Sequence, residues 1–243
     1  MGDLQPMVIF GMQKTTLLDY PNHLATILFT GGCNFHCSYC HNAELISPSS
    51  NMPQISQHEI FAHLEKRQHI LDGVVISGGE PTLQKDLPDF LRKIKSLSYK
   101  IKLDTNGSNP SMLQTLAMDG LLDYVAMDIK QSPSRYYEIT GNVFCDLSSI
   151  CESVDLLLHG NLTDSNGQPL PYEFRTTVCA ETHCKEDFRD IGTWIQGASN
   201  YYLQPYQESP QVLHPDFHSP SASMMDAFLH EISPFVSHVA IRG

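Results

Sequence analysis

The fold is decided by residues 24–40, whose sequence is LATILFTGGCNFHCSYC. The first seven residues form a continuous apolar run rich in β-favouring side chains, which indicates a strand covered on both faces, as in a parallel sheet. Two glycines then lead directly into Cys33, Cys37 and Cys40. A buried strand that ends in a cysteine-rich loop predicts an α/β fold with reactive side chains at a strand's carboxyl end.

Outward from this stretch, the chain alternates predicted strands with predicted helices. After residues 24–30, strands are expected at residues 73–77, 100–105, 123–130, 172–178 and 201–206, each followed by a helical pattern. Six sequential strand–helix units imply a parallel sheet with right-handed crossovers. An open doubly wound sheet and a partial (β/α)6 barrel both fit this alternation.

The positions of polar and reactive side chains favour the partial barrel. They lie at or just beyond the ends of several different strands, at Cys33, Gly79, Glu80, Asp104, Asp128, Lys130 and Tyr206. Loops converge over such strand ends in a barrel, whereas open sheets bind ligands mainly near one switch point. No shift in composition indicates a linker, so we expect a single domain over residues 1–243. Its core would span about residues 14–210, followed by a C-terminal helix and tail at 211–243.

Composition and charge exclude several classes of protein. Of the 243 residues, 41% are hydrophobic, which excludes intrinsic disorder, and the formal net charge of −12 opposes binding to nucleic acid. No apolar run approaches the roughly 18–20 residues of a membrane span. The first ten residues also lack the basic and apolar regions of an export signal. We therefore expect a cytoplasmic protein without a nucleic-acid or membrane partner.

The cysteine cluster indicates a metal centre. Cys33, Cys37 and Cys40 follow one another at spacings of four and three residues. Three such thiolates can hold three corners of a [4Fe–4S] cluster, and the fourth iron would stay open to a substrate. A structural zinc with His36 or His41 as fourth ligand is the main alternative, but no second short ligand pair accompanies it. Three unrelated buried thiols are the remaining interpretation.

The motif and its surroundings resemble a known superfamily. The pattern C-x3-C-x2-C with Tyr39 before the third cysteine resembles the signature of radical S-adenosylmethionine enzymes. More specific segments are KTTLLDYP (14–21), FTGGCNF (29–35), YCHN (39–42), GGEPT (78–82), DTNG (104–107), MDIK (127–130) and FRTTV (174–178). Together, over residues 14–206, they resemble the glycyl-radical-enzyme activating proteins, and among these the activators of anaerobic ribonucleoside-triphosphate reductase.

This resemblance implies a reaction and its cofactors. In the family, the open iron of one [4Fe–4S] cluster is chelated by the amino and carboxylate groups of S-adenosylmethionine. One electron from the reduced cluster cleaves the sulfonium to methionine and a 5′-deoxyadenosyl radical, which takes a hydrogen atom from a glycine of the partner enzyme. The resemblance also implies a partial (β/α)6 barrel and a flavodoxin-like or other low-potential electron donor.

The resemblance assigns further residues to the cofactor site. It implies backbone contacts to adenine from Tyr39 and His41, and contacts to the amino acid moiety from a segment that includes Gly78, Gly79 and Glu80. The remaining predicted contacts are Asp104, Thr105, Asp128 and Lys130, with a monovalent cation near the two aspartates. Without the resemblance, the same glycines would be read as a turn and the same aspartates as turn or cap residues.

Some residues and functions stay open. Gln207 stands where related activases carry a cofactor-contacting His, and Cys145, Cys151, Cys179 and Cys184 are expected to be structural or incidental thiols. Activation of another glycyl radical enzyme, such as pyruvate formate-lyase, is an alternative within the same family. Small-molecule radical chemistry in the same barrel is a second alternative, and a zinc-bearing interaction module is the non-enzymatic one.

Overall fold

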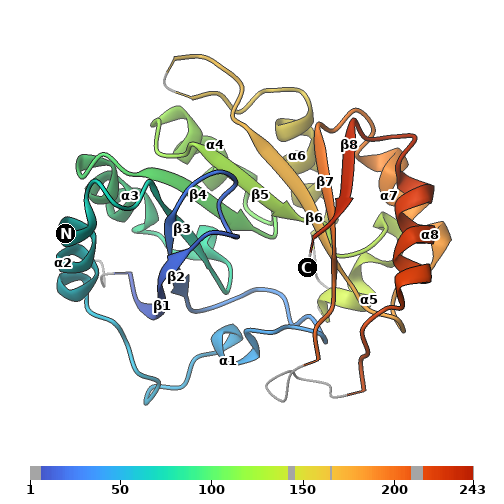
Figure 1. Cartoon of the computed structure of the whole chain (residues 1–243), viewed down its shortest axis with the longest axis horizontal. Coiled ribbons are helices and arrows are strands. Elements are labelled where there is room, and N and C mark those ends of the chain that lie inside the picture. The colour runs from blue at the N-terminus through green and yellow to red at the C-terminus, as the bar shows by residue number, and fades with distance from the viewer. Residues whose placement is uncertain (1–6, 142–145, 165, 209–215, 243) are drawn as a thin grey trace.

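The strands form one curved sheet with helices packed along its outer face (Figure 1). The computed structural model describes residues 7–141, 146–164, 166–208 and 216–242. The eight strands follow one another in chain order, and β1 (Ile9–Thr16) is antiparallel to β2 (Ala25–Thr30). The strands parallel to β2 are β3 (Gly73–Gly78), β4 (Lys100–Thr105), β5 (Tyr124–Asp128), β6 (Tyr172–Val178), β7 (Asn200–Pro205) and β8 (His238–Ile241).

Helices connect the parallel strands. They are α1 (Ala43–Ile46), α2 (Gln57–Arg67), α3 (Leu87–Ser96), α4 (Pro110–Met118), α5 (Tyr136–Thr140), α6 (Leu147–Leu158), α7 (Lys185–Trp194) and α8 (Ala222–Ile232). Two short 3₁₀ turns lie at Pro81–Leu83 and Pro133–Arg135. Two of the helix starts are set by local sequence, since Ser56 accepts a bond from the Glu59 amide and Asn109 from the Met112 amide. No helix in the described ranges is long and apolar enough to cross a membrane.

The prediction of an α/β fold with parallel strands is confirmed. The six expected strands correspond to β2 through β7, and each is followed by at least one helix. The expected strand at 123–130 is shorter, because β5 ends at Asp128. Strands β1 and β8 were not predicted, and they form the two edges of the sheet.

The two faces of the sheet carry different side chains. On β2 and β3, Leu28, Val74 and Ile76 belong to the large core beneath the helices, while the alternate residues Ile27 and Val75 form a small second cluster. Because side chains alternate across a strand, the small cluster lies on the face opposite the helices. Toward the carboxyl ends of the strands, that same face carries polar side chains, and there the candidate site lies.

Candidate active site

A cavity of about 200 Å³ lies over the carboxyl ends of β2 to β6. All twelve residues predicted for the site line it, namely Cys33, Cys37, Tyr39, Cys40, His41, Gly78, Gly79, Glu80, Asp104, Thr105, Asp128 and Lys130. These residues come from four segments of the sequence, at 33–41, 78–80, 104–105 and 128–130. The structure therefore brings together the whole predicted set.

Backbone hydrogen bonds hold the cysteine loop over the sheet. The amides of Gly32 and Cys33 donate to the carbonyls of Leu45 and Ile46 over 2.8 and 3.1 Å, and the His36 amide donates to Thr140 O over 2.7 Å. Burial raises the pKa of the Cys33 thiol to about 11, an effect that the Phe35 amide donating to its sulfur partly offsets. The same desolvation raises the pKa of Cys37 to about 12. The free protein therefore carries these two thiols protonated at neutral pH.

The glycines after β3 allow this strand to approach the cysteine loop closely. A Cβ on Gly79 would lie 2.2 Å from Gly32 O, and one on Gly78, whose φ is +112°, would lie 2.4 Å from the Thr30 backbone. The Glu80 amide donates to Gly32 O over 2.8 Å. The missing side chains therefore let these two backbone segments pack against each other.

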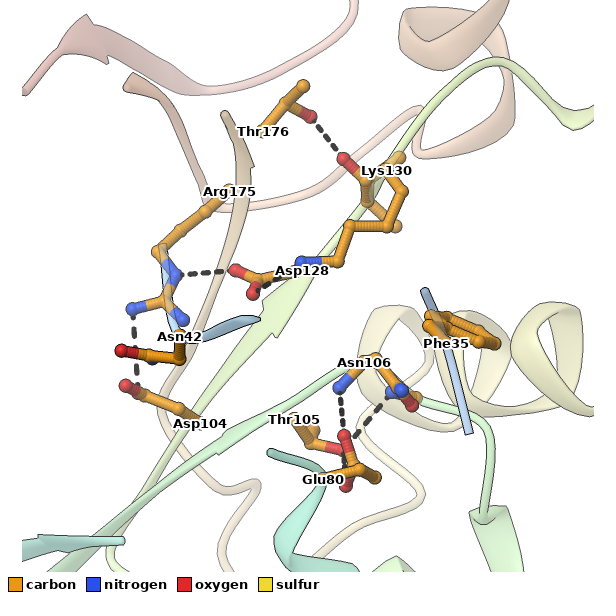
Figure 2. A network of polar contacts seen from close by, with 12 residues as sticks. Phe35, Asn42, Glu80, Asp104, Thr105, Asn106, Asp128, Lys130, Arg175 and Thr176 are labelled. Carbon is orange, nitrogen blue, oxygen red and sulfur yellow. Dashed lines mark hydrogen bonds and ion pairs between the residues drawn. The ribbon is translucent and has the colours of Figure 1, made fainter. Parts of the chain in front are cut away.

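Glu80 is buried and bonded to the next strand along. Its Oε1 accepts from the Thr82 amide (3.1 Å), the Thr82 hydroxyl (2.5 Å) and the Thr105 hydroxyl (2.8 Å), and its Oε2 accepts from the Asn106 amide (2.6 Å). Burial raises the pKa of Glu80, although these four donors counteract it. The carboxylate thus ties the loop after β3 to the loop after β4 (Figure 2).

Charged side chains from β4, β5 and β6 meet on the other side of the cavity (Figure 2). Arg175 lies between two carboxylates, with Nε 2.9 Å from Asp128 Oδ1 and an amino nitrogen 3.4 Å from Asp104 Oδ1. Lys130 Nζ lies 3.0 Å from Asp128 Oδ2, and the buried Lys102 Nζ lies 2.6 Å from Asp104 Oδ1. Burial alone would raise the pKa of Asp128, but Arg175 and Lys130 outweigh it and lower the pKa to about 2.

Lys130 is held in its charged form by its surroundings. Burial favours the neutral amine, but the Asp128 carboxylate outweighs this and raises the pKa of Lys130 above its ordinary value. The network of Lys102, Asp104, Asp128, Lys130 and Arg175 contains three cations and two anions. Of these five residues, Lys130, Arg175, Asp104 and Asp128 line the cavity with the cysteines, and Lys102 does not.

His41 and Tyr39 are placed differently around the third cysteine. The His41 ring stacks on Tyr206 with centroids 5.1 Å apart, and its Nε2 lies 2.8 Å from the Gln207 carbonyl. Gln207 thus contacts the site through its backbone. Tyr39 is buried, and its hydroxyl has no hydrogen-bond partner among the described residues.

The cavity has residues that the sequence analysis did not assign to the site. Arg175 and Asn106 both line it. Arg175 sits within the quoted FRTTV segment, where an arginine alternating with apolar residues on a predicted strand was the available signal. Asn106 stands in the DTNG segment, which reads equally as a turn.

Three further cysteines of the described residues lie elsewhere. Cys179 is packed in the large core, Cys151 is half-buried on α6, and Cys184 precedes α7 with its sulfur 3.2 Å from Asp187. Cys145 lies outside the described residues. Within the described ranges, no three His, Cys, Asp or Glu side chains converge on a single-ion site. The three clustered thiols share the cavity without meeting at one point.

Comparisons with known proteins place the chain in a family. The model of the Radical SAM superfamily matches residues 27–165, which is more than half of the chain. A Methanocaldococcus jannaschii protein named for glycyl-radical enzyme activation is 30% identical over 207 residues, covering 82% of this chain and 80% of its own length. The pyruvate formate-lyase-activating enzyme of Listeria monocytogenes is 29% identical over 125 residues, covering 47% of this chain and 50% of that enzyme.

A solved structure agrees at the level of the fold. SuiB of Streptococcus suis, bound to S-adenosylmethionine, superposes with a TM-score of 0.63 at 13% identity. The match covers 87% of this chain and 48% of SuiB, so the chain spans about half the length of that protein. The family model covers more than half of the chain, and the Methanocaldococcus jannaschii relative is matched over 80% of its length. The chain therefore belongs to the radical S-adenosylmethionine superfamily of enzymes, whose members use a [4Fe–4S] cluster and S-adenosylmethionine.

Proposed function

We propose that this chain activates a glycyl radical enzyme, using one [4Fe–4S] cluster and S-adenosylmethionine bound in the cavity over the strand ends. The observation that carries the proposal is that all twelve predicted residues line that one cavity. The relative named for this activation, which the chain matches over 80% of that protein's length, supports the same choice of reaction.

The donor set of the cavity fits the cluster. Cys33, Cys37 and Cys40 supply three thiolates, which can ligate three of four irons and leave the fourth for a ligand outside the protein. When bound, the reduced cluster and S-adenosylmethionine together supply a 5′-deoxyadenosyl radical for hydrogen abstraction. The protein's part is to bind, orient and shield these groups.

The charged side chains fit the amino acid moiety of S-adenosylmethionine. Lys130 and Arg175 both line the cavity, and either cation can form a charge-assisted contact with the cofactor's carboxylate. Glu80 is the carboxylate we assign to the ammonium group. Its Oε2 accepts one bond, from the Asn106 amide, and so retains acceptor capacity toward the cavity.

The remaining assignments complete the proposal. Tyr39 and His41 would contact adenine through their backbone, and Thr105 would act by supporting Glu80, to which its hydroxyl donates. A monovalent cation at Asp104 and Asp128 would be an additional positive charge beside Arg175, which already bridges both carboxylates. We expect its contribution to be small for that reason.

We propose anaerobic ribonucleoside-triphosphate reductase as the partner, on the strength of the sequence segments that resemble its activators. A low-potential, flavodoxin-like protein in the cytoplasm would supply the electron. The alternatives are another partner of the same class, such as pyruvate formate-lyase, and a small-molecule substrate.

Radical formation on a candidate partner tests this function. The reconstituted chain would be reduced anaerobically with S-adenosylmethionine and either purified ribonucleotide reductase or purified pyruvate formate-lyase, and electron paramagnetic resonance would follow the glycyl radical doublet. We expect the doublet with the reductase and only background with the lyase. The reverse pattern would reassign the partner. Cleavage of S-adenosylmethionine without a doublet on either enzyme would contradict activation of these partners.

A further inference from the structure

The side-chain amide of Asn106 lies against the sulfur of Cys33. Asn106 Nδ2 is 4.0 Å from Cys33 Sγ, at the outer limit for a hydrogen bond to sulfur, and 3.0 Å from Asn34 Oδ1. An amide nitrogen carries two hydrogens, so it can donate to both acceptors. Asn106 is only 6% exposed, which keeps water from competing for either bond.

Neighbouring bonds fix which end of the amide faces the cysteine. The Ser108 amide donates to Asn106 Oδ1 over 2.9 Å, so the oxygen is turned toward the helix α4 side of the loop and the nitrogen toward Cys33. The backbone amide of Asn106 donates to Glu80 Oε2 over 2.6 Å (Figure 2). A flipped side chain would set its oxygen against both Asn34 Oδ1 and the cysteine sulfur.

A further hydrogen bond ties the two loops together. Asn34, which follows Cys33 in the chain, donates from Nδ2 to Ser108 Oγ over 2.9 Å. The Asn34 side chain of the cysteine loop therefore donates to Ser108 and accepts from Asn106, both in the loop after β4. The donor that faces Cys33 is therefore held from both sides and has little freedom to leave the sulfur.

We propose that Asn106 is a positioning residue that tunes the reduction potential of the cluster through its hydrogen bond to Cys33. This inference rests on the proposed function, because it takes Cys33 as a cluster ligand. Hydrogen bonds to the sulfurs of an iron–sulfur cluster are among the factors that set its potential. A donor stabilises the more negatively charged, reduced form, so Asn106 raises the potential and makes the cluster easier to reduce.

The test is a redox titration of the reconstituted protein, followed by the electron paramagnetic resonance signal of the reduced cluster. Asn106→Leu keeps the size and the backbone bond to Glu80 but removes the donor, and Asn106→Asp also places an anion beside the sulfur. We expect both midpoints to be more negative than in the wild type, with Asp the lower. For the Leu variant we expect up to about a tenfold change in the reduction equilibrium, equivalent to about 59 mV.

Controls separate this effect from damage to the loop. Asn109 lies in the same loop, where its Oδ1 caps α4 and its Nδ2 donates to Thr82 O over 2.8 Å. Asn109→Asp adds the same charge without facing Cys33, and its midpoint should stay at the wild-type value. Asn106→Ser, which is smaller and whose hydroxyl is too short to reach the sulfur, repeats the neutral test if the Leu variant loses iron.

Different outcomes would contradict different parts of the proposal. A wild-type midpoint in Asn106→Leu or Asn106→Ser at full iron content would overturn the role of Asn106, and so would a shift to a more positive potential. Full iron content in Cys33→Ala would instead overturn the ligand assignment on which the proposed function rests.

Discussion

At the scale of single residues, Glu80 and Lys130 have the same proposed ligand but very different surroundings. Glu80 accepts four hydrogen bonds from three residues, whereas Lys130 Nζ is paired with the Asp128 carboxylate at 3.0 Å. Removing the Glu80 carboxylate would leave four donors without their acceptor, each costing about 1–3 kcal/mol if it stays buried. The Lys130 variant is therefore the cleaner probe of cofactor binding.

Replacing Lys130 should weaken binding of S-adenosylmethionine and leave the cluster in place. A charge-assisted contact of this kind is worth on the order of 1.5–3 kcal/mol, so Lys130→Met should raise the dissociation constant roughly tenfold to a hundredfold. Equilibrium dialysis at full iron content measures it. The matched control is Lys100→Met, because Lys100 is exposed and begins β4, at the end of the strand away from the cavity. Equal affinity in both variants would remove Lys130 from the site.

Glu80 should affect both stability and affinity. Glu80→Gln keeps the shape of the side chain but replaces one carboxylate oxygen by an NH₂ group. That group would face Thr82 and Thr105 or the Asn106 amide, which are themselves hydrogen-bond donors. We expect a lower urea midpoint for the iron-free protein together with weaker S-adenosylmethionine binding. A variant that binds the cofactor weakly at unchanged stability would mean that the four bonds contribute little to the fold.

The cysteines should divide into two groups by iron content. Cys33→Ala, Cys37→Ala and Cys40→Ala should each lose the cluster and all cleavage of S-adenosylmethionine, because each removes one of the three thiolates that we propose as cluster ligands. Cys179→Ala and Cys184→Ala should keep about four irons per chain, as should variants of Cys145 and Cys151. Iron and sulfide analysis after anaerobic reconstitution measures this. Loss of half the iron in a variant of the second group would indicate another cluster.

At the scale of elements, the buried strands could be predicted and the edge strands could not. Residues of β2 are almost all buried, so the apolar run stood out in the sequence, whereas β1 has three exposed residues in succession at Gln13–Thr15. Strand β8 is only four residues long. Such short or polar edge strands resist aggregation, but they lack the continuous apolar pattern that marks an inner strand.

The site could be predicted only in part, for a related reason. Cys33 and Glu80 could be assigned to the candidate site because each lies in a short contiguous motif, C-x3-C-x2-C for Cys33 and GGEPT for Glu80. Arg175 acts across strands instead: it reaches Asp128 on β5 and Asp104 on β4, two strands away. Which charges meet across a sheet depends on register, and a single sequence does not state the register of a parallel sheet.

This bridge by Arg175 predicts how the site responds to cations. The guanidinium already supplies positive charge between Asp104 and Asp128, so replacing potassium by tetramethylammonium should change wild-type affinity for S-adenosylmethionine less than about threefold. Arg175→Met removes the cation that bridges these two half-buried carboxylates, so the affinity of this variant for S-adenosylmethionine should become dependent on potassium. Strong dependence in the wild type would show that a cation site coexists with the arginine.

At the scale of the whole molecule, acid stability should depend on a buried histidine between β6 and α7. His183 is 5% exposed, and burial lowers its pKa from 6.5 to about 4. Its Nε2 lies 3.2 Å from Lys130 O and its Nδ1 lies 2.8 Å from the Thr182 hydroxyl. The charged groups near it are Asp187 and Arg135, which are paired with each other at 2.8 Å.

The sign of the pH effect follows from the lowered pKa. The folded protein keeps His183 neutral, while the unfolded chain takes up a proton below pH 6.5, so this stability is complete above pH 6.5 and is lost as the pH falls toward 4. The difference is worth about 3 kcal/mol. His183→Gln should flatten the fall in urea-unfolding free energy over that range. The exposed control His58→Gln should keep the wild-type slope, and equal slopes in all three proteins would contradict the effect.

The most direct test of the central claim is the fate of one hydrogen atom. A partner enzyme labelled with deuterium at the Cα of its glycines would be activated anaerobically, and mass spectrometry would measure deuterium in the 5′-deoxyadenosine formed. The proposed function predicts one deuterium per product molecule and one glycyl radical for each. Product that carries no deuterium, formed at the same rate with or without the partner, would contradict activation of that glycyl radical enzyme by this chain.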